Sequence, residues 1–363
     1  MKHITIFLDQ YTHKNGGSAT LIELGEALTQ LGHRVNYVVN YFTVKSILVN
    51  FGRGIYPATF MDSNSGYSPK RLVKDTIKTF YSPSVGSVLR RSDYVIVPFV
   101  SPQRLARIKQ STKAKLVLNH AASVDMMTSI VQQNGHTYSA YCSLFDRVLF
   151  QSGADCKTSG LPNATTLRPS FREDKAANLG VSKVLSDQHV NIVWVGSLQT
   201  RKRPDLALDV VRKLLAYDYT YKLTLVGPHY DAAYAAGIRE QALSLPPGTV
   251  EIAGFRENYL QYMSEADAIV QTSELEGVSR IIRESFFLGK VVATFNIQGT
   301  SEICTTDNAI LVPFGHVDQL AEQVHAALTD TTVRQKLQAN ARLTYERDYS
   351  WDAYRAAAGK IFA

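Results

Sequence analysis

Short apolar runs alternate with longer amphipathic segments along most of the chain. In the first half the apolar runs are HITIFL, RVNYVV, YVIVPF, KLVLNH and RVLFQS, each of a length typical of a buried strand. In the first intervening segment, residues 18–31, leucine recurs at helical spacing, at Leu21, Leu24, Leu28 and Leu31. Gly32 follows, where a helix is expected to end. The alternation predicts an α/β protein with a doubly wound parallel sheet.

The alternation is interrupted by one polar stretch, PSFREDKAANLGVSKVLSDQ, at residues 169–188. It then restarts with NIVWVG, KLTLVG, TVEIAG, DAIVQT and VVATFN. A chain of 363 residues is long enough for two domains that each bury a core. We therefore predict domains at residues 1–170 and 190–349, a linker at residues 171–189, and a cleft between the domains.

Basic residues are concentrated in the first half of the chain. Residues 1–170 hold 19 Lys and Arg against 9 Asp and Glu, a net charge of +10, whereas the remainder holds 20 against 23. This asymmetry favours an anionic partner for the first domain, either a membrane surface or a polyanionic substrate. We expect no nucleic-acid partner, because the chain has no zinc-finger spacing, RNP-type run or basic base-reading helix.

The rest of the composition is that of an ordinary soluble protein, with 45% apolar and 20% charged residues. No apolar run approaches ~18 residues, and the N-terminal MKHITIFLDQ reads as a strand rather than a signal peptide. We therefore expect a cytoplasmic protein. Cys142, Cys156 and Cys304 are odd in number and lack the spacing of metal ligands, which favours buried thiols over a disulfide or a zinc site.

The most informative segment is SELEGVSRIIRESFFLGK at residues 273–290, which carries Glu276 and Glu284. On one continuous helix these carboxylates would lie ~80° apart. A loop followed by a helix from about Arg280 to Gly289, with Ser279 near its N-cap, explains the segment better. Short buried strands, DAIV and VVA, flank it. Ligands of such sheets bind beyond the carboxyl ends of the strands, so both glutamates can reach one ligand at different atoms.

Three further elements follow predicted strands. The first is NGGSAT, where Gly16 and Gly17 let backbone amides approach a phosphate or a sugar closely. The second is VGSLQTRKRPD, where three cations precede a helix that opens at Pro204, a placement suited to a diphosphate. These cations are Arg201, Lys202 and Arg203. The third is His120 in KLVLNHAAS, at the carboxyl end of a strand.

Taken together, these motifs resemble the retaining GT-B glycosyltransferases of the family 4 type (glycosyl transferases group 1) over nearly the whole chain. EGVSRIIRE matches the Glu-x7-Glu signature of that family, and Gly289 and VVATFN follow it as the family pattern requires. The other matching positions are the Gly16–Gly17 pair, Gly196, Leu198 and Lys202, the Gly299–Glu302 turn, and Trp351. At Ser197 this chain departs from the family arginine, so that phosphate contact would fall to Arg201 or Arg203.

The resemblance implies two Rossmann-like domains facing a cleft, the C-terminal one binding a UDP- or GDP-sugar as donor. A helix at about 350–363 would pack back on the N-terminal domain. Glu284 would accept hydrogen bonds from the ribose, and Glu276 would contact the transferred sugar. The donor would also be contacted by the backbone at Gly16, Gly17, Gly196, Gly277, Val278 and Ser279.

The resemblance also implies a transfer that retains the anomeric configuration without an enzymatic nucleophile, unlike the two-carboxylate hydrolases. Lys202 and Arg201 would stabilise the departing diphosphate, and His120 would contact the donor sugar or the acceptor hydroxyl. We find no Asp-x-Asp motif and expect neither a metal nor another cofactor. The first domain would bind the acceptor, a cell-surface glycan, a polymer or a lipid-linked precursor.

Each assignment has a simpler alternative. Glu276 and Glu284 can be surface carboxylates, the RKR run a solvated face, His120 a hydrogen-bonded core residue, and the Gly16–Gly17 pair a tight turn. Trp351 is expected to serve packing. At the level of function, the alternatives are a GT-B epimerase or phosphorylase and a degenerate GT-B subunit that binds glycan or stabilises a partner transferase.

The segment SPKRLVKDTIKTFY at residues 68–81 has one apolar and one basic helical face. Such a helix can lie on an anionic membrane, which would place the protein peripherally at the inner face of the membrane. The alternative is a helix packed on its own domain with a solvated basic face.

Overall fold

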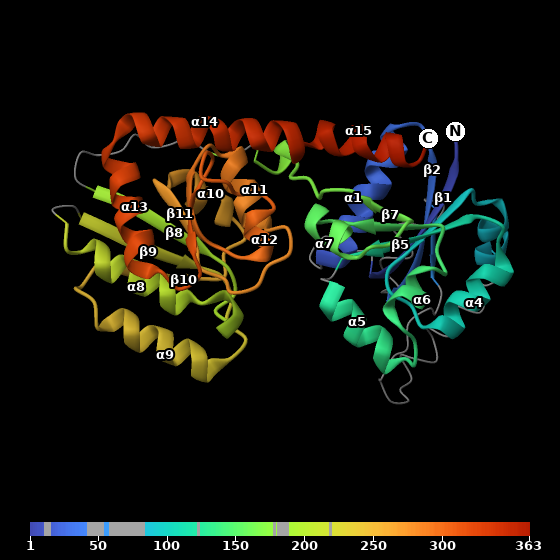
Figure 1. Cartoon of the computed structure of the whole chain (residues 1–363), viewed down its shortest axis with the longest axis horizontal. Helices are drawn as coiled ribbons and strands as arrows, with labels where there is room; N and C mark the ends of the chain where they lie inside the picture. The colour runs from blue at the N-terminus through green and yellow to red at the C-terminus, as the bar shows by residue number, and fades with distance from the viewer. Residues whose placement is uncertain are drawn as a thin grey trace. The chain divides into compact units, whose positions relative to one another are not determined.

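The computed structural model describes residues 1–10, 16–41, 54–57, 84–121, 124–176, 179, 189–217 and 220–363. The chain divides into two compact units (Figure 1). The first comprises Met1–Pro169 together with Tyr354–Ala363, and the second comprises Ser170–Ala353. Each unit is built on its own parallel sheet.

The described part of the first unit contains a parallel sheet of order β3-β2-β1-β4-β5-β6-β7. Its strands are β1 (His3–Gln10), β2 (Arg34–Tyr41), β3 (Ile55–Pro57), β4 (Tyr94–Val97), β5 (Lys115–His120), β6 (Arg147–Phe150) and β7 (Ala164–Thr166). The helices are α1 (Gly16–Gln30), α4 (Pro102–Ser111), α5 (Val124–Gln133), α6 (Tyr138–Cys142) and α7 (Gly153–Thr158), and residues 84–91 are also helical.

Helix α1 shows how far leucine spacing defines an element. Leu21, Leu24 and Leu28 are buried, as the spacing predicts, and Gly32 adopts φ +83° just beyond the helix end. Leu31 is 39% exposed and lies outside the helix. The helix also begins earlier than the sequence predicted, at Gly16 rather than at residue 18. The glycine pair therefore forms the first turn of the helix instead of the loop before it.

The second unit contains a parallel sheet of order β10-β9-β8-β11-β12-β13. Its strands are β8 (His189–Val195), β9 (Thr220–Val226), β10 (Val250–Gly254), β11 (Ala268–Gln271), β12 (Val291–Asn296) and β13 (Ile310–Pro313). The helices are η2 (Thr200–Lys202), α8 (Pro204–Leu214), α9 (Ala232–Leu243), α10 (Tyr259–Glu265), α11 (Arg280–Phe287), α12 (Gln298–Ser301), α13 (Val317–Thr329) and α14 (Thr331–Asp348).

Strand order in the second sheet reverses between β8 and β11, which are hydrogen-bonded neighbours. The apolar runs seen in the sequence fill its core, with Trp194, Leu223, Val270 and Phe295 all nearly inaccessible to solvent. In open α/β sheets, ligands bind beyond the carboxyl ends of the strands where the order reverses. The loops that follow β8 and β11 are therefore the positions to examine for a site.

The polar stretch after residue 169 and the end of the chain differ in where they pack. Phe171 N–H donates to Tyr349 O (3.0 Å), and Glu173–Ala176 forms a 3-10 helix, so residues 170–176 belong to the second unit. Apart from residue 179, the rest of the expected linker, 177–188, lies outside the described residues. Helix α15 (Trp351–Ile361) carries the chain into the first unit. There Phe362 is buried and packs edge-to-face with Tyr94, with 5.2 Å between the ring centroids.

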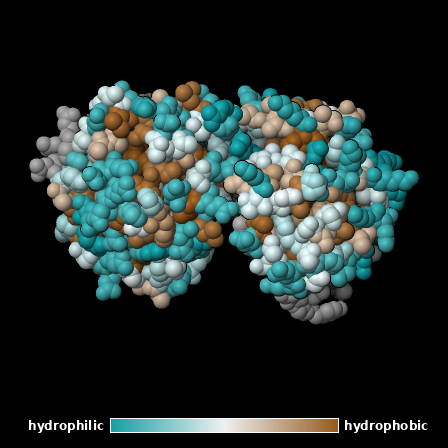
Figure 2. Space-filling model, viewed as in Figure 1, coloured by the Kyte–Doolittle hydropathy of each residue, from teal (hydrophilic) through white to brown (hydrophobic). Residues whose placement is uncertain are grey.

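Hydrophilic residues cover much of the face seen in Figure 2, and exposed large apolar side chains are scattered. Within the described ranges, no helix combines the length and apolarity needed to cross a bilayer. Cys142 and Cys304 are buried free thiols and Cys156 is half-buried. The basic amphipathic segment 68–81 lies outside the described residues.

Candidate functional site

The segment that carries the two glutamates folds as a loop and a helix. Glu276 lies in the loop after β11, and Glu284 lies within α11, which begins at Arg280. Ser279 caps this helix, its Oγ accepting a hydrogen bond from the Ile282 N–H (3.4 Å). Gly289 ends the segment at φ +62°, a conformation that favours glycine. Each of these local features agrees with the expectation from the sequence.

Lys202 and Glu276 form an ion pair although 74 residues separate them. Lys202 comes from η2, which follows β8, so the pair joins the loops after β8 and β11 at the point where strand order reverses. The Lys202 side chain is 20% exposed and that of Glu276 is 10% exposed. Limited exposure strengthens the attraction relative to a surface pair, because less water screens it.

Gln271, the last residue of β11, also contacts Glu276. Its Nε2 donates to Glu276 Oε1 (3.0 Å), and its Oε1 accepts a hydrogen bond from Ser279 Oγ (2.8 Å). The amide thus ties the Glu276 carboxylate to the N-cap of α11. Gln271 was not among the site residues predicted from the sequence. A polar side chain that ends an otherwise apolar buried strand is the signal that would have found it.

Thr272, the residue after Gln271, holds the basic loop, the segment after β8 that carries Lys202, in place. Its hydroxyl is fully buried and donates to Arg203 O (2.6 Å), and it accepts a hydrogen bond from Trp194 Nε1–H (3.1 Å). The end of β11 therefore fixes the backbone that follows Lys202. No sequence motif indicated this contact, because one threonine among many is not distinctive.

The two arginines beside Lys202 take different roles in the structure. Arg201 donates from its guanidinium to Leu275 O (2.6 Å), on the loop that carries Glu276. Arg203 has φ 49°, the left-handed region, and pairs with Asp205 (2.7 Å). The hydrogen bond to Asp205 raises the pKa of Arg203 further above its usual value. Arg201 therefore hydrogen-bonds the backbone of the Glu276 loop, whereas Arg203 reaches the same loop through a longer ion pair with Glu274 (3.8 Å).

Glu284 is 1% exposed. Its Oε1 accepts a hydrogen bond from the Tyr259 hydroxyl (2.8 Å) and lies 3.4 Å from Arg280 Nε. Burial, reinforced by the neighbouring carboxylate, raises the pKa of Tyr259 well above its usual value, so the phenol remains a donor. Glu284 is thus held in position by donors from α10 and α11.

Glycines shape the backbone around the acidic loop, the segment after β11 that carries Glu276. A Cβ on Gly299, in α12, would lie 2.2 Å from both Glu276 O and Gly277 O, so no larger residue fits there without moving the loop. A Cβ on Gly227 would lie 1.7 Å from Gly196 O, so the turn after β9 packs closely on the turn after β8. Around Gly277 the space that a Cβ would occupy is open. The amides of Gly277, Val278 and Ser279 precede the N-terminus of α11, where an anion is favoured.

The remaining candidates from the sequence belong to the first unit. His120 ends β5, is 1% exposed, shares a hydrogen bond with the Tyr138 hydroxyl (2.9 Å), and stacks on Phe150 (4.3 Å between ring centroids). This is the environment that a hydrogen-bonded core histidine requires. Gly16 and Gly17 open α1, and residues 11–15 before them lie outside the described residues.

Within the second unit, the arrangement is suited to an anionic ligand with hydroxyl groups. Lys202 and Arg201 supply positive charge, the α11 N-terminus supplies amides, and Glu276 supplies a hydroxyl acceptor. The described residues contain no cluster of three or more His, Cys, Asp or Glu side chains that could hold a metal ion.

Comparison with known proteins gives one family match. Residues 181–344 match the family model described as glycosyl transferases group 1. A D-inositol 3-phosphate glycosyltransferase of Jonesia denitrificans is 26% identical over 175 residues, which span 44% of this chain and 40% of that relative. The match therefore spans less than half the length of the curated relative.

Solved structures resemble the whole chain. HepE of Anabaena, in complex with UDP, aligns over 99% of both chains with a TM-score of 0.74 and 17% identity. A glycosyltransferase of Rickettsia africae aligns over 99% of this chain and 97% of its own, with a TM-score of 0.71 and 18% identity. At these identities the likeness shows the fold.

Proposed function

We propose that this protein is a retaining glycosyltransferase that uses a nucleoside diphosphate sugar, because residues 181–344 match the family model of the glycosyl transferases group 1. The GT-B fold predicted from the sequence is confirmed by the two parallel sheets and by the whole-chain likenesses. The observation that carries the proposal is the Lys202–Glu276 ion pair, which joins the loops after β8 and β11 at the strand-order reversal.

The ion pair gives donor binding a physical basis. Without ligand, Lys202 and Glu276 neutralise each other in a partly dehydrated position. A nucleoside diphosphate sugar offers each a better partner, because its phosphate can take the ammonium while its sugar hydroxyls donate to the carboxylate. The amides of Gly277, Val278 and Ser279, together with the turn at Gly196, would face the diphosphate. Glu284 would accept from the ribose hydroxyls in exchange for one of its present donors.

Charge stabilisation is the main catalytic demand in such a site. Negative charge grows on the β-phosphate as the bond to the sugar breaks, and Lys202 and Arg201 lie where cations would compensate it. We propose that the acceptor hydroxyl attacks from the face the phosphate leaves and passes its proton to the departing phosphate oxygen, which retains the anomeric configuration. The two cations supply the charge that a divalent metal supplies elsewhere, so we propose a reaction without a metal requirement.

We assign acceptor binding to the first unit, because residues 1–170 carry the net charge of +10. A glycan, polymer or lipid-linked precursor with anionic groups fits that charge. Gly16 and Gly17 would contact the donor or the acceptor through the amides of the first turn of α1. His120 is enclosed, so a ligand contact at this residue requires the Tyr138 hydrogen bond to open. We further propose that the protein works at the inner face of the membrane.

The proposal is tested by donor turnover. UDP-sugars and GDP-sugars are incubated with the protein, with and without candidate acceptors and with and without EDTA, and release of the nucleotide is measured. The UDP bound in the HepE structure makes UDP-sugars the first donors to test. Nucleotide release that an acceptor accelerates and EDTA leaves unchanged is expected. Binding of the donor without any turnover would instead favour a non-catalytic glycan-binding subunit.

A further inference from the structure

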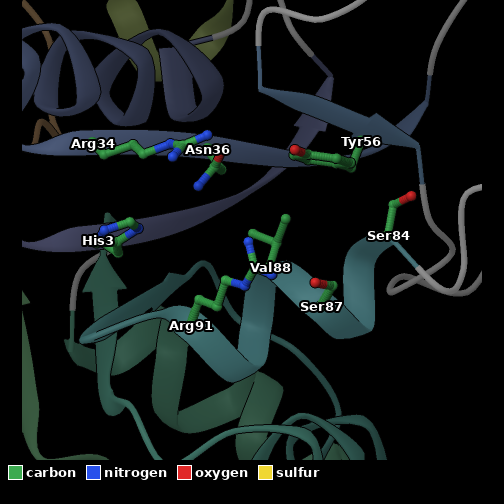
Figure 3. A pocket seen from close by; sticks show the side chains of 8 residues that line it. All are labelled: His3, Arg34, Asn36, Tyr56, Ser84, Ser87, Val88 and Arg91. Atoms are coloured by element: carbon green, nitrogen blue, oxygen red, sulfur yellow. The ribbon is translucent and has the colours of Figure 1, made fainter.

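The first unit has a pocket of about 230 Å³ at the amino-terminal edge of its sheet (Figure 3). Its lining includes His3, Arg34, Asn36, Tyr56, Ser87 and Arg91. His3 and Arg34 are the first residues of β1 and β2, whereas His120 ends β5. Because the sheet is parallel, the pocket lies at the edge opposite to the one where the sequence placed a ligand contact.

Strand alternation explains why polar residues line this pocket. Arg34, Asn36 and Val38 share one face of β2, and the register pairs His3 with Arg34. Val38 is fully buried in the core together with Leu89 of the helix at residues 84–91, so that helix covers this face. Toward the start of the strands, the same face changes from apolar to polar. The pocket is therefore a continuation of the core face with side chains that can bind a ligand.

The pocket has an excess of positive charge. Neither Arg34 nor Arg91 forms an ion pair with any residue that the structure describes, and the described lining residues include no carboxylate. The nearby Asp93 is already engaged, since its Oδ2 accepts the His3 backbone N–H (2.7 Å). Two guanidinium groups without a carboxylate partner favour an anion between them.

Asn36 is the second observation that points to a ligand. It is 8% exposed, and its amide makes no hydrogen bond to the described part of the chain. Figure 3 shows it projecting from β2 toward the helix at residues 84–91. Because Asn36 lines the pocket, a ligand oxygen there can accept a hydrogen bond from this amide without displacing a protein partner. The neighbouring Ser87 and Tyr56 hydroxyls add further donors on the same lining.

We propose that this pocket binds the phosphate group of a soluble phosphate monoester. A phosphate oxygen matches the bidentate geometry of a guanidinium and accepts from amide and hydroxyl donors. The volume leaves room for an organic group beside the phosphate, since one water needs only roughly 10–15 Å³. The site is separate from the proposed donor site, whose residues all belong to the second unit or to the opposite edge of this sheet.

The test is calorimetric titration with inorganic phosphate and with glycerol phosphate in low-salt, phosphate-free buffer. The double substitution Arg34→Gln with Arg91→Gln should weaken binding of both about tenfold or more, since hydrogen bonds to charged groups are lost. The matched control is Arg90→Gln, an exposed arginine on the same helix whose guanidinium lies over Gly86. It changes charge by the same amount per site and should leave the affinity within about twofold of the wild type.

Three results would overturn the proposal. These are no binding of phosphate by the wild-type protein, equal weakening by the control, and displacement of phosphate by excess UDP. A sedimentation assay with phosphatidic acid vesicles separates the two sources of a phosphate monoester. Vesicle binding that depends on Arg34 and Arg91, without any binding of glycerol phosphate, would replace the soluble ligand by a lipid headgroup. Equal melting temperatures of the variants show that the fold is intact.

Discussion

At the scale of single residues, the candidate site depends on how Glu276 is held. Lys202 balances its charge, Gln271 orients its Oε1, and Gly299 leaves no room for the loop to move toward α12. These contacts come from the loop after β8, the end of β11 and α12. A carboxylate held from several sides loses little entropy when a ligand arrives, which is what selective recognition of sugar hydroxyls requires.

Lys202→Ala tests the role of the ammonium group in diphosphate binding. The dissociation constant for UDP should rise by about tenfold to a hundredfold, equivalent to ~1.5–3 kcal/mol for a hydrogen bond to a charged group. The measurement is calorimetric titration with UDP. Lys222→Ala is the matched control, because Lys222 pairs with Glu251 (2.7 Å) in the same unit and is 44% exposed. An unchanged affinity of the Lys202 variant would transfer the role to Arg201.

Gly299→Ala tests whether close packing positions the acidic loop. The added methyl would meet Glu276 O and Gly277 O, so the loop must shift, and donor turnover should fall by at least tenfold. Gly237→Ala is the control, because Gly237 lies in α9 with open space around it. That change should leave turnover unchanged and add up to ~1 kcal/mol of stability. Equal turnover by both variants would show that Gly299 does not position Glu276.

At the scale of elements, the hydrophobic pattern predicted most strands of both sheets, because these strands are continuous apolar runs. The short strands β3, β7 and β13, each at an edge of its sheet, were not predicted. The start of α11 was also predictable, since Ser279 and Gly289 carry local signals. The start of α1 was not, because a glycine pair is compatible with both a turn and a helix N-terminus. The contacts of Gln271 and Thr272 were equally hidden, since they depend on which strands are neighbours.

Thr272→Val tests the contact between β11 and the basic loop. The substitution keeps the shape but leaves Arg203 O and the Trp194 indole N–H without their buried partner. The free energy of unfolding of the second unit should fall by ~1–3 kcal/mol, measured by urea denaturation. Thr272→Ser retains the hydroxyl and should recover more than half of the loss. A Val variant as stable as the wild type would show that the hydroxyl does not hold the loop.

At the scale of the whole molecule, the chain crosses from the second unit to the first within α15. Two runs of the same alternation were enough to predict two sheets, because each sheet is built from local strand and helix units. Which unit residues 170–176 would join was not predictable, since a polar composition does not reveal a contact such as Phe171 with Tyr349.

Phe362→Ala tests the anchoring of the chain's last residues in the first unit. Phe362 is fully buried beside Tyr94, so its truncation should cost ~3–5 kcal/mol of the stability of that unit. Leu343→Ala, on α14 and 61% exposed, is the control and should stay within ~0.5 kcal/mol of the wild type. Thermal unfolding followed by circular dichroism measures both. Similar melting temperatures for the two variants would contradict the anchoring role.

We infer that the Glu276 carboxylate, paired with Lys202, serves glycosyl transfer. The most direct measurement is the rate of transfer from a UDP-sugar by Glu276→Gln, compared with Glu274→Gln in the same loop, where the Glu274 side chain is 46% exposed. We expect Glu276→Gln to lower the rate by about a hundredfold or more while UDP affinity and melting temperature stay close to wild type, and we expect Glu274→Gln to leave the rate unchanged. A Glu276→Gln variant that transfers sugar at the wild-type rate, or loses stability in proportion to activity, would contradict it.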